Sequence, residues 1–289
     1  MKPPRFEYHR AGSVDEVVAL LAEHADEAKV LAGGQSLVPM LNFRLLRPSI
    51  LVDINRIPDL AYVREDGDAI RVGALTRHHQ LETSPVIARH FPVLTEAMMH
   101  VAHLAIRNRG TIGGSLSHAD PAAELPMMAM LLDAELKIVS RVGMRRVAAR
   151  DFFRDALTVD LAEDELVTEV VLPKLPPATG WGFEEVSRRS GDFAVAAVAV
   201  TLTLDRGAIA EARIAMTGVA PTPRRASEAE EMLAGKNLDG GVSKDVIEAI
   251  RSAAEPPTDL HASSDYRRHL VGVLAGRALA AAWQRASAA

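Results

Sequence analysis

Eight residues near the middle of the chain restrict its possible folds more than any other segment. Residues 173–180 read Pro-Lys-Leu-Pro-Pro-Ala-Thr-Gly, with three prolines and one glycine. Proline fixes its own φ and lacks a backbone N–H, so a helix or a central strand cannot continue through this segment. Because 289 residues exceed the usual size of one domain, we expect two domains, residues 1–175 and residues 180–289.

The first region alternates between helical and strand-like patterns. Ser13 and Glu16 form a Ser-x-x-Glu capping box, followed by apolar residues at helical spacing. Strand-like runs follow at residues 29–31, 50–54 and 69–74. Residues 92–104 have a helical apolar face, whereas residues 107–115 contain three glycines and are expected to form a loop. This alternation predicts layers of helices and sheet.

The second region begins with three strand-like runs and ends in helical patterns. The strands are expected at residues 181–187, 194–204 and 208–217, and the helices near residues 224–234, 243–254 and 264–286. The turn Asp205-Arg206-Gly207 joins the last two strands, which favours an antiparallel sheet. The whole chain is therefore expected to be α+β, ending in a small domain with a three-stranded antiparallel sheet and a helical cluster.

Composition excludes several classes of function. The sequence has no cysteine, which excludes disulfides, a thiol nucleophile and a cysteine-ligated iron–sulfur cluster on this chain. With 33 Lys plus Arg against 38 Asp plus Glu, the net charge is −5 and no basic run suits nucleic acid. The polar N-terminus lacks a signal sequence and no apolar run is long enough to span a membrane, so we expect a cytoplasmic protein.

Two glycine pairs, each followed by polar side chains, are the main candidates for ligand binding. They lie in residues 32–36, Ala-Gly-Gly-Gln-Ser, and residues 111–115, Thr-Ile-Gly-Gly-Ser. Glycine lets backbone N–H groups approach an anion closely, so a diphosphate could lie between the two segments. Neither segment is a P-loop or a Rossmann glycine motif. The alternative is that each pair only makes a tight turn.

Other polar residues have both functional and structural interpretations. Asp120 and Glu124 follow the second glycine segment and could accept hydrogen bonds from ribose or ribityl hydroxyls. Alternatively, Asp120 is a turn residue and Glu124 a first-turn helix acid. His100 and His103 have a spacing that two metal ligands can adopt, but no acidic partner supports a metal site. The methionines at positions 127, 128 and 130 fit core packing better than a ligand site.

Several motifs together resemble one family. They are residues 32–37 (Ala-Gly-Gly-Gln-Ser-Leu), 111–115, 118–121 (His-Ala-Asp-Pro), 188–193 (Arg-Arg-Ser-Gly-Asp-Phe), 218–223 and 265–268. In this order and spacing they resemble the FAD-binding medium subunit of the molybdenum hydroxylases. That family includes bacterial carbon monoxide dehydrogenase and the flavoprotein part of xanthine dehydrogenase. The resemblance covers nearly the whole chain, and it implies a PCMH-type FAD-binding domain of two α/β lobes before the small C-terminal domain.

The resemblance also implies a set of FAD contacts. The two glycine segments would hold the pyrophosphate, Glu124 the ribityl or ribose hydroxyls with Asp120 beside it, Phe193 would lie near the flavin ring, and Leu166 would be an apolar contact. The cofactor-binding residues implied are Ala32, Gly33, Gly34, Gln35, Ser36, Leu37, Thr111, Gly113, Gly114, Ser115, Asp120, Glu124, Leu166 and Phe193. Some relatives have a lysine directly after the aromatic at Phe183, where this chain has Glu184 and Glu185.

The function implied by the resemblance is that of an electron-transfer flavoprotein. Electrons would come from two [2Fe-2S] clusters on a small subunit, after oxidation of substrate at a molybdenum cofactor on a large subunit, and FAD would pass them to an external acceptor. The assembly would be a dimer of heterotrimers, and this chain would need neither catalytic residues nor a metal site of its own. Two alternatives remain: a self-contained FAD-dependent oxidoreductase and a flavin-free scaffold subunit.

Overall fold

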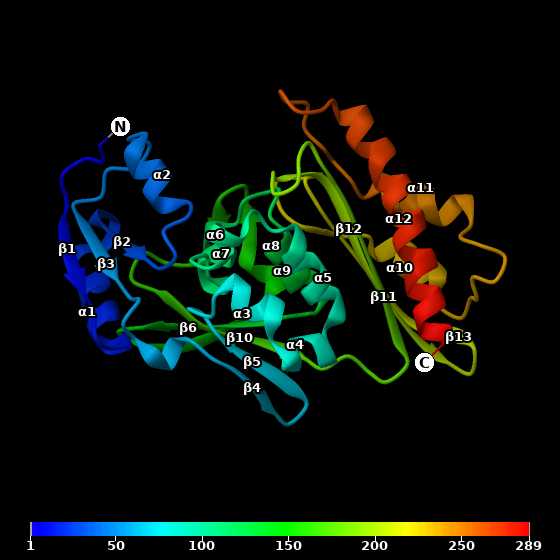
Figure 1. Ribbon diagram of the computed structural model, residues 1–289, viewed down its shortest axis with the longest axis horizontal. Helices are drawn as coiled ribbons and strands as arrows, with labels where there is room; N and C mark the ends of the chain where they lie inside the picture. Colours follow the sequence, from blue (N-terminus) through cyan, green and yellow to red (C-terminus); the bar gives the residue numbers. More distant parts are fainter. Residues whose placement is uncertain (1, 289) are drawn as a thin grey trace.

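The computed structural model describes residues 2–288 and arranges them in three consecutive units along the long axis of the molecule (Figure 1). We call these units the N-terminal lobe (residues 7–53), the middle lobe (residues 58–173) and the C-terminal unit (residues 179–287). Each has its own sheet with helices packed against it. The expected α+β fold, with two mixed lobes before a unit with an antiparallel sheet, is confirmed.

The N-terminal lobe is a small parallel sheet with one well-capped helix on it. Its elements are β1 (Glu7–Arg10), α1 (Val14–His24), a 3-10 turn (Ala25–Glu27), β2 (Ala28–Leu31), α2 (Leu37–Asn42) and β3 (Ile50–Asp53). The strand order is β1-β3-β2, and both pairings are parallel. The Ser13 side chain accepts the Glu16 N–H at 3.2 Å, which is one half of the predicted capping box, whereas the Glu16 carboxylate accepts the Gly12 N–H at 2.8 Å in place of the Ser13 N–H. Residues 32–36 lie between β2 and α2, at the carboxyl end of the sheet.

The middle lobe is a five-stranded antiparallel sheet covered by short helices. Its strands are β4 (Val63–Asp66), β5 (Ala69–Gly73), β6 (Glu135–Ser140), β7 (Gly143–Ala148) and β10 (Leu166–Pro173), in the order β4-β5-β10-β6-β7, and β8 (Phe153–Asp155) pairs only with β9 (Thr158–Val159). Its helices are a 3-10 turn (Pro58–Leu60), α3 (His78–Thr83), α4 (Pro85–His90), α5 (Pro92–His100), α6 (Leu104–Arg107), α7 (Ile112–His118), α8 (Glu124–Leu131) and α9 (Ala149–Phe152).

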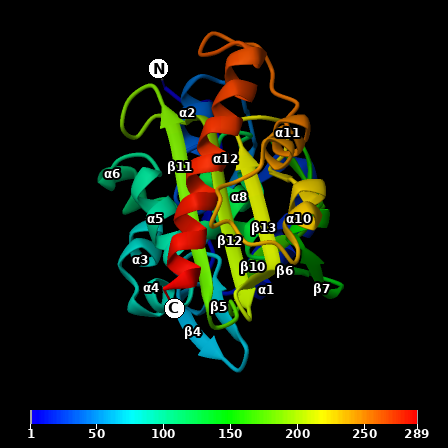
Figure 2. The same ribbon diagram turned by 90° about the vertical axis from the view of Figure 1, so that its right-hand side faces the viewer.

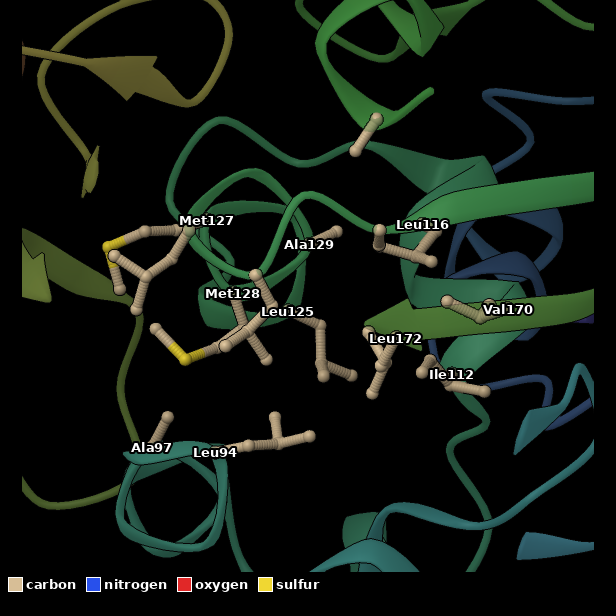
Figure 3. Packing of buried hydrophobic residues seen from close by; sticks show 14 of the residues in the cluster. Leu94, Ala97, Ile112, Leu116, Leu125, Met127, Met128, Ala129, Val170 and Leu172 are labelled. Carbon is tan, nitrogen blue, oxygen red and sulfur yellow. The ribbon is translucent and has the colours of Figure 1, made fainter. Parts of the chain in front are cut away.

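Helix α8 lies at the centre of the molecule. It contacts α5 and α7 in the middle lobe, and also β12 and β13 of the C-terminal sheet. Figure 3 shows its apolar side chains between Leu94 of α5 and Leu172 of β10. Met127 and Met128 are fully buried there, which confirms their assignment to the core. A helix that is apolar all round suits this position between two layers.

Two local predictions in this lobe were wrong. The helix expected over residues 92–104 ends at His100, because Ala102 has a positive φ of 45° and the Arg107 side chain binds the Val101 and Ala102 carbonyls at 3.0 and 2.9 Å. The segment expected to be a loop over residues 107–115 begins with the last residue of α6, Arg107, and ends with the first turn of α7. Thr111 caps α7, accepting the Gly114 N–H at 3.1 Å.

The C-terminal unit packs one long helix across an antiparallel sheet (Figure 2). The strands β11 (Thr179–Ser187), β12 (Ala194–Asp205), β13 (Ala208–Thr217) and β14 (Arg224–Arg225) pair in that order, so the three expected strands gain a two-residue fourth. The helices are α10 (Ser227–Leu233), α11 (Lys244–Ser252) and α12 (Ser264–Ser287). Gly182 allows the close approach of α12, since a Cβ there would lie 2.0 Å from the Ala278 carbonyl oxygen. Within residues 2–288, no helix is long and apolar enough to cross a membrane.

Candidate functional site

The two glycine segments, far apart in sequence, lie against one another. A Cβ at Gly33 would be 2.3 Å from the Arg109 carbonyl oxygen and 2.9 Å from the Gly110 Cα. A Cβ at Gly114 would be 4.0 Å from the Ala32 Cβ. The carboxyl end of the N-terminal sheet and the start of α7 therefore meet at one place. The edge of a parallel sheet at its carboxyl ends is a common position for ligands.

The two segments differ in how their backbone N–H groups are used. Within residues 2–288, the N–H groups of residues 33–36 donate to no protein acceptor. Gly34 also has a φ of +72°, which turns the chain so that successive N–H groups can form a concave anion site. In contrast, the Gly113 N–H donates to the Ala74 oxygen at 2.9 Å and the Gly114 N–H to the Thr111 hydroxyl. Within the described residues, the first segment therefore supplies four consecutive free backbone donors, whereas the two glycine N–H groups of the second segment already have protein acceptors.

Gly113 allows close packing between α7 and the end of β5. A Cβ on this residue would lie 2.6 Å from the Ala74 Cβ, so glycine is needed for α7 to rest on the end of β5. Ser115 is half-buried next to the exposed Gly114. Gly114 is thus the residue of this segment that lies beside Ala32 of the first one.

Two residues that sequence reasoning missed hold the segments together. The Asn55 amide donates to the Ala32 carbonyl at 2.8 Å and to Asp53 at 2.6 Å. The Arg77 guanidinium donates to the Asn55 side chain at 2.6 Å and also to the Arg109 carbonyl. This chain of hydrogen bonds runs from the first segment to the backbone before the second. The sequence signal that could have found Asn55 was its position two residues after the end of β3, at the carboxyl end of the parallel sheet.

A buried histidine, also missed, supports the second segment from behind. The His78 ring is 6% exposed and its Nε2 lies 3.0 Å from the Thr111 carbonyl oxygen. Gly110 passes directly over this ring, since a Cβ there would be 2.8 Å from it. Burial lowers the pKa of His78 from 6.5 to about 4, so the ring is neutral at pH 7.

This histidine predicts an acid-sensitive site. A base whose folded-state pKa is depressed binds fewer protons when folded, so the stability that it confers is present above pH 6.5 and lost as the pH falls towards 4. The loss at pH 4 is on the order of 3 kcal/mol. Denaturant unfolding of the wild type at several pH values should show this slope, and His78→Gln should flatten it. His79→Gln, at the half-exposed neighbouring ring, is the control and should keep the slope; equal slopes in all three proteins would contradict the prediction.

Asp120 and Glu124 lie at the far end of α7 from the glycine segments. Asp120 accepts the Ala122 N–H at 2.9 Å, which is the turn geometry given as its structural alternative. Glu124 is the first residue of α8 and is only 5% exposed. Burial, and to a lesser extent the charge of Asp120, raise the pKa of Glu124 to about 7. The C-terminal unit holds this turn in place, because the Thr217 hydroxyl lies 3.1 Å from the Ala123 carbonyl oxygen.

A second buried carboxylate, Glu185 of β11, was noticed in the sequence but not assigned to the site. Its side chain is 1% exposed and lies 3.9 Å from the His100 Nδ1. Burial and then the charge of Glu124 raise the pKa of Glu185 to about 8. The junction between the middle lobe and the C-terminal unit therefore holds two carboxyl groups with raised pKa values, those of Glu124 and Glu185.

The last two residues implied by the resemblance lie apart from each other. Leu166 is buried in the apolar cluster that Ala32 also contacts, close to the first glycine segment. Phe193 is 62% exposed in the loop before β12. This loop packs on the turn after α5, since a Cβ at Gly191 would lie 2.5 Å from the His103 ring. His103 caps α6, whereas His100 ends α5, so the two histidines are on different helices.

Taken together, these residues suit an elongated ligand with an anionic middle part. Unused backbone donors and a Cβ-free contact occur where the glycine segments meet. Two carboxyl-bearing residues, Asp120 and Glu124, lie one helix further on. The exposed ring of Phe193 offers a flat apolar surface in the loop before β12. The fold and site thus define a protein that binds a diphosphate-containing cofactor.

Two protein families match the chain in succession. Residues 4–175 match the family described as the FAD binding domain in molybdopterin dehydrogenase. Residues 181–282 match the CO dehydrogenase flavoprotein C-terminal domain.

Full-length relatives agree with these matches. The chain is 44% identical to the 6-hydroxypseudooxynicotine dehydrogenase complex subunit alpha of Paenarthrobacter nicotinovorans, covering 99% of this chain and 97% of that one. It is 39% identical to the carbon monoxide dehydrogenase medium chain of Hydrogenophaga pseudoflava, covering 99% of both. Its fold superposes on reconstituted CO dehydrogenase from Oligotropha carboxidovorans with a TM-score of 0.96 at 36% identity, covering 99% of this chain and 100% of that one.

The chain therefore belongs to the FAD-binding medium subunits of the molybdenum hydroxylase family. The prediction of FAD as the cofactor is confirmed, as is that of an oxidoreductase flavoprotein subunit. The relatives are subunits of multi-subunit dehydrogenase complexes.

Proposed function

We propose that this chain is the electron-transfer subunit of a heterotrimeric molybdenum hydroxylase. The observation that carries the proposal is the meeting of the two glycine segments, with four consecutive unused N–H groups within the described residues. When bound, FAD supplies one- and two-electron redox chemistry, while the protein orients it and tunes its potential. The cytoplasmic location expected from the sequence stays a prediction.

The residues that would hold FAD fall into groups, and each group would contact a different part of the cofactor. Residues 33–36 would bind the pyrophosphate through backbone N–H groups, with Gly114 and Ser115 on the other side. Glu124, and Asp120 beside it, would accept hydrogen bonds from the sugar-alcohol hydroxyls. Phe193 would contact the flavin ring. The remaining members of the proposed set are Ala32, Leu37, Thr111, Gly113 and Leu166, which shape the walls of the site.

The partner subunits are those that the family resemblance implies, and the missing cysteines agree with them. This chain has no thiolate to ligate an iron–sulfur cluster. We therefore assign the two [2Fe-2S] clusters to a small subunit and the molybdenum cofactor to a large one, with an external acceptor taking the electrons and a dimer of heterotrimers as the assembly. Residues 1–175 would form the FAD-binding domain and residues 180–289 the C-terminal domain. The substrate would bind to the large subunit.

Reconstitution tests this assignment. The isolated FAD-loaded chain is expected to show no flavin bleaching with the native complex's substrate, although dithionite should bleach it. Adding the small and large subunits should restore substrate-dependent bleaching. The measurement is the visible absorbance of oxidised flavin under anaerobic conditions, with the large subunit omitted as the matched control.

Two outcomes would support the alternatives instead. Substrate turnover by the single chain, at a rate unaffected by the other subunits, would favour a self-contained FAD-dependent oxidoreductase. A chain that assembles with both partners yet never takes up FAD would favour a flavin-free scaffold.

A further inference from the structure

A cavity lies at the junction of the middle lobe and the C-terminal unit, away from the site described above. It has a volume of about 550 Å³, and no residue of the two glycine segments lines it. One wall is formed by α9 and β8, a second by the carboxyl-terminal end of α8, and a third by residues 221–225, which include β14. Sites for small molecules usually have volumes of about 300–1,000 Å³, so the cavity is large enough for one.

Arginine dominates the charged lining of this cavity. Four arginines and one acidic residue line it, namely Arg150, Arg154, Arg224, Arg225 and Asp155. The carboxylates that pair with Arg154, Arg224 and Arg225 belong to residues outside the wall. The wall is therefore cationic. Guanidinium groups bind phosphate through two parallel hydrogen bonds, which makes a phosphate-bearing ligand the chemical match.

Arg225 is the fixed part of this wall. Its guanidinium donates to the Glu230 carboxylate at 2.6 and 2.9 Å, to the Met130 carbonyl at 3.1 Å and to Asp133 at 3.2 Å. All three of its nitrogens are used, and they join β14 to the end of α8. Arg225 therefore holds the walls together and leaves the recognition of a ligand to the other three arginines.

Those three arginines keep donors that no described protein group uses. Arg150 of α9 is exposed and has no carboxylate partner among residues 2–288. Arg154 is 57% exposed and donates through Nη2 to Asp160 at 3.0 Å. Arg224 donates through Nη2 to Glu255 at 3.1 Å, whereas its buried Nε has no acceptor among the described residues. Three cations with spare donors border one cavity, and ion pairing within the protein does not account for them.

The rest of the wall suits the other parts of a nucleotide. Its apolar members are Met130, Phe153, Pro221 and Pro223, which offer a surface to a base. The Asp155 carboxylate can accept a hydrogen bond from a ribose hydroxyl. A simple inorganic anion would use the arginines and leave the apolar residues uncovered. A cationic wall beside an apolar one therefore favours a nucleoside phosphate.

We propose that this cavity is a binding site for a nucleoside phosphate, separate from the FAD site. The phosphates bind to Arg150, Arg154 and Arg224, and the base lies against the apolar residues. Because the ligand contacts both the middle lobe and the C-terminal unit, it stabilises their junction. The site goes beyond the proposed function and does not depend on it, since neither glycine segment lines the cavity.

The first test is calorimetric titration of the FAD-saturated full chain with ADP, so that FAD already occupies the cofactor site. One ADP is expected to bind per chain. At 100 times its dissociation constant, ADP should raise the melting temperature by about 5 °C. Adenosine, which lacks phosphates, and pyrophosphate, which lacks the base, should each bind about tenfold more weakly or worse. Absence of ADP binding would overturn the site, and binding of either fragment as tightly as ADP would overturn its assignment to a nucleotide.

The second test uses variants to locate the bound ADP. Combining Arg150→Gln with Arg154→Gln should weaken ADP binding by about 100-fold or more, because each change removes a charged donor to phosphate. Both side chains are exposed, so this double variant should fold. The control is Arg146→Gln, at an exposed arginine of β7 outside the cavity wall, which should bind ADP like the wild type.

Two results of the second test would overturn the proposal. Equal ADP affinity in the wild type, the double variant and the control would show that ADP binds elsewhere. Tighter binding of a glutamate-rich peptide than of ADP, lost in the double variant, would show that the arginines recognise an acidic protein segment instead. If the chain took up no FAD, the same titrations without it would still decide the matter, because only the cavity variants should lose ADP.

Discussion

Gly33→Val is expected to weaken FAD binding by about 100-fold or more. A Cβ at this position would lie 2.3 Å from the Arg109 carbonyl oxygen and 2.9 Å from the Gly110 Cα. Both are backbone atoms, so the two glycine segments would have to separate. Hydrogen bonds to a charged group are worth about 1.5–3 kcal/mol each, and losing two of them corresponds to roughly 100-fold or more in affinity.

The matched control is Gly240→Val, in an exposed turn of the C-terminal unit. A Cβ at Gly240 would meet no atom within 4 Å, so this protein should bind FAD like the wild type. Fluorescence titration gives the dissociation constants, and circular dichroism checks that both variants are folded. If folded Gly33→Val retained wild-type affinity, the close contact between the segments would have no role in FAD binding.

The sequence predicted the parts of this site that depend on backbone freedom. Glycine pairs followed by polar side chains indicated an anion site, and residues 32–36 have the unused N–H groups that such a site needs. The sequence could not assign those donors, because the partner of Gly113 is the Ala74 carbonyl, which tertiary packing brings to it. Helical periodicity likewise missed the end of α5 at His100. Just after this residue the Arg107 side chain binds the Val101 and Ala102 carbonyls, and periodicity does not reveal such a contact.

Glu185 was missed for a related reason. In the sequence it is one of two adjacent glutamates on a strand, and an exposed role is usual for that residue type. Strand alternation alone says that Glu184 and Glu185 face opposite ways, but not which one is buried. Only the packing of α12 on one face of β11 and of α5 on the other decides this. Burial of a charged group is thus a feature that a single sequence does not reveal.

Arg267→Met is expected to destabilise the protein by about 3–5 kcal/mol, because it leaves two buried backbone carbonyls without donors, at about 1–3 kcal/mol each, and removes an ion pair. Arg267 is 4% exposed, and its guanidinium donates to the Val195 and Gly218 carbonyls at 2.6 and 2.8 Å and to Asp259 at 2.7 Å. The variant leaves both carbonyls buried without donors. For a chain of this size the melting temperature should fall by about 10 °C.

The neighbouring Arg268 provides the control for this variant. It is half-exposed and pairs with Asp265 at 3.8 Å, so Arg268→Met should cost less than about 1 kcal/mol.

The two residues also differ in their connection to the cofactor site. Gly218, which Arg267 holds through its carbonyl, donates its own N–H to the Pro121 carbonyl at 2.8 Å, in the turn that leads to Glu124. Arg267→Met should therefore also weaken FAD binding at a temperature where it is still folded, whereas Arg268→Met should not. Equal melting temperatures and FAD affinities for the two variants would show that the hydrogen bonds of Arg267 contribute neither to stability nor, through Gly218, to FAD binding.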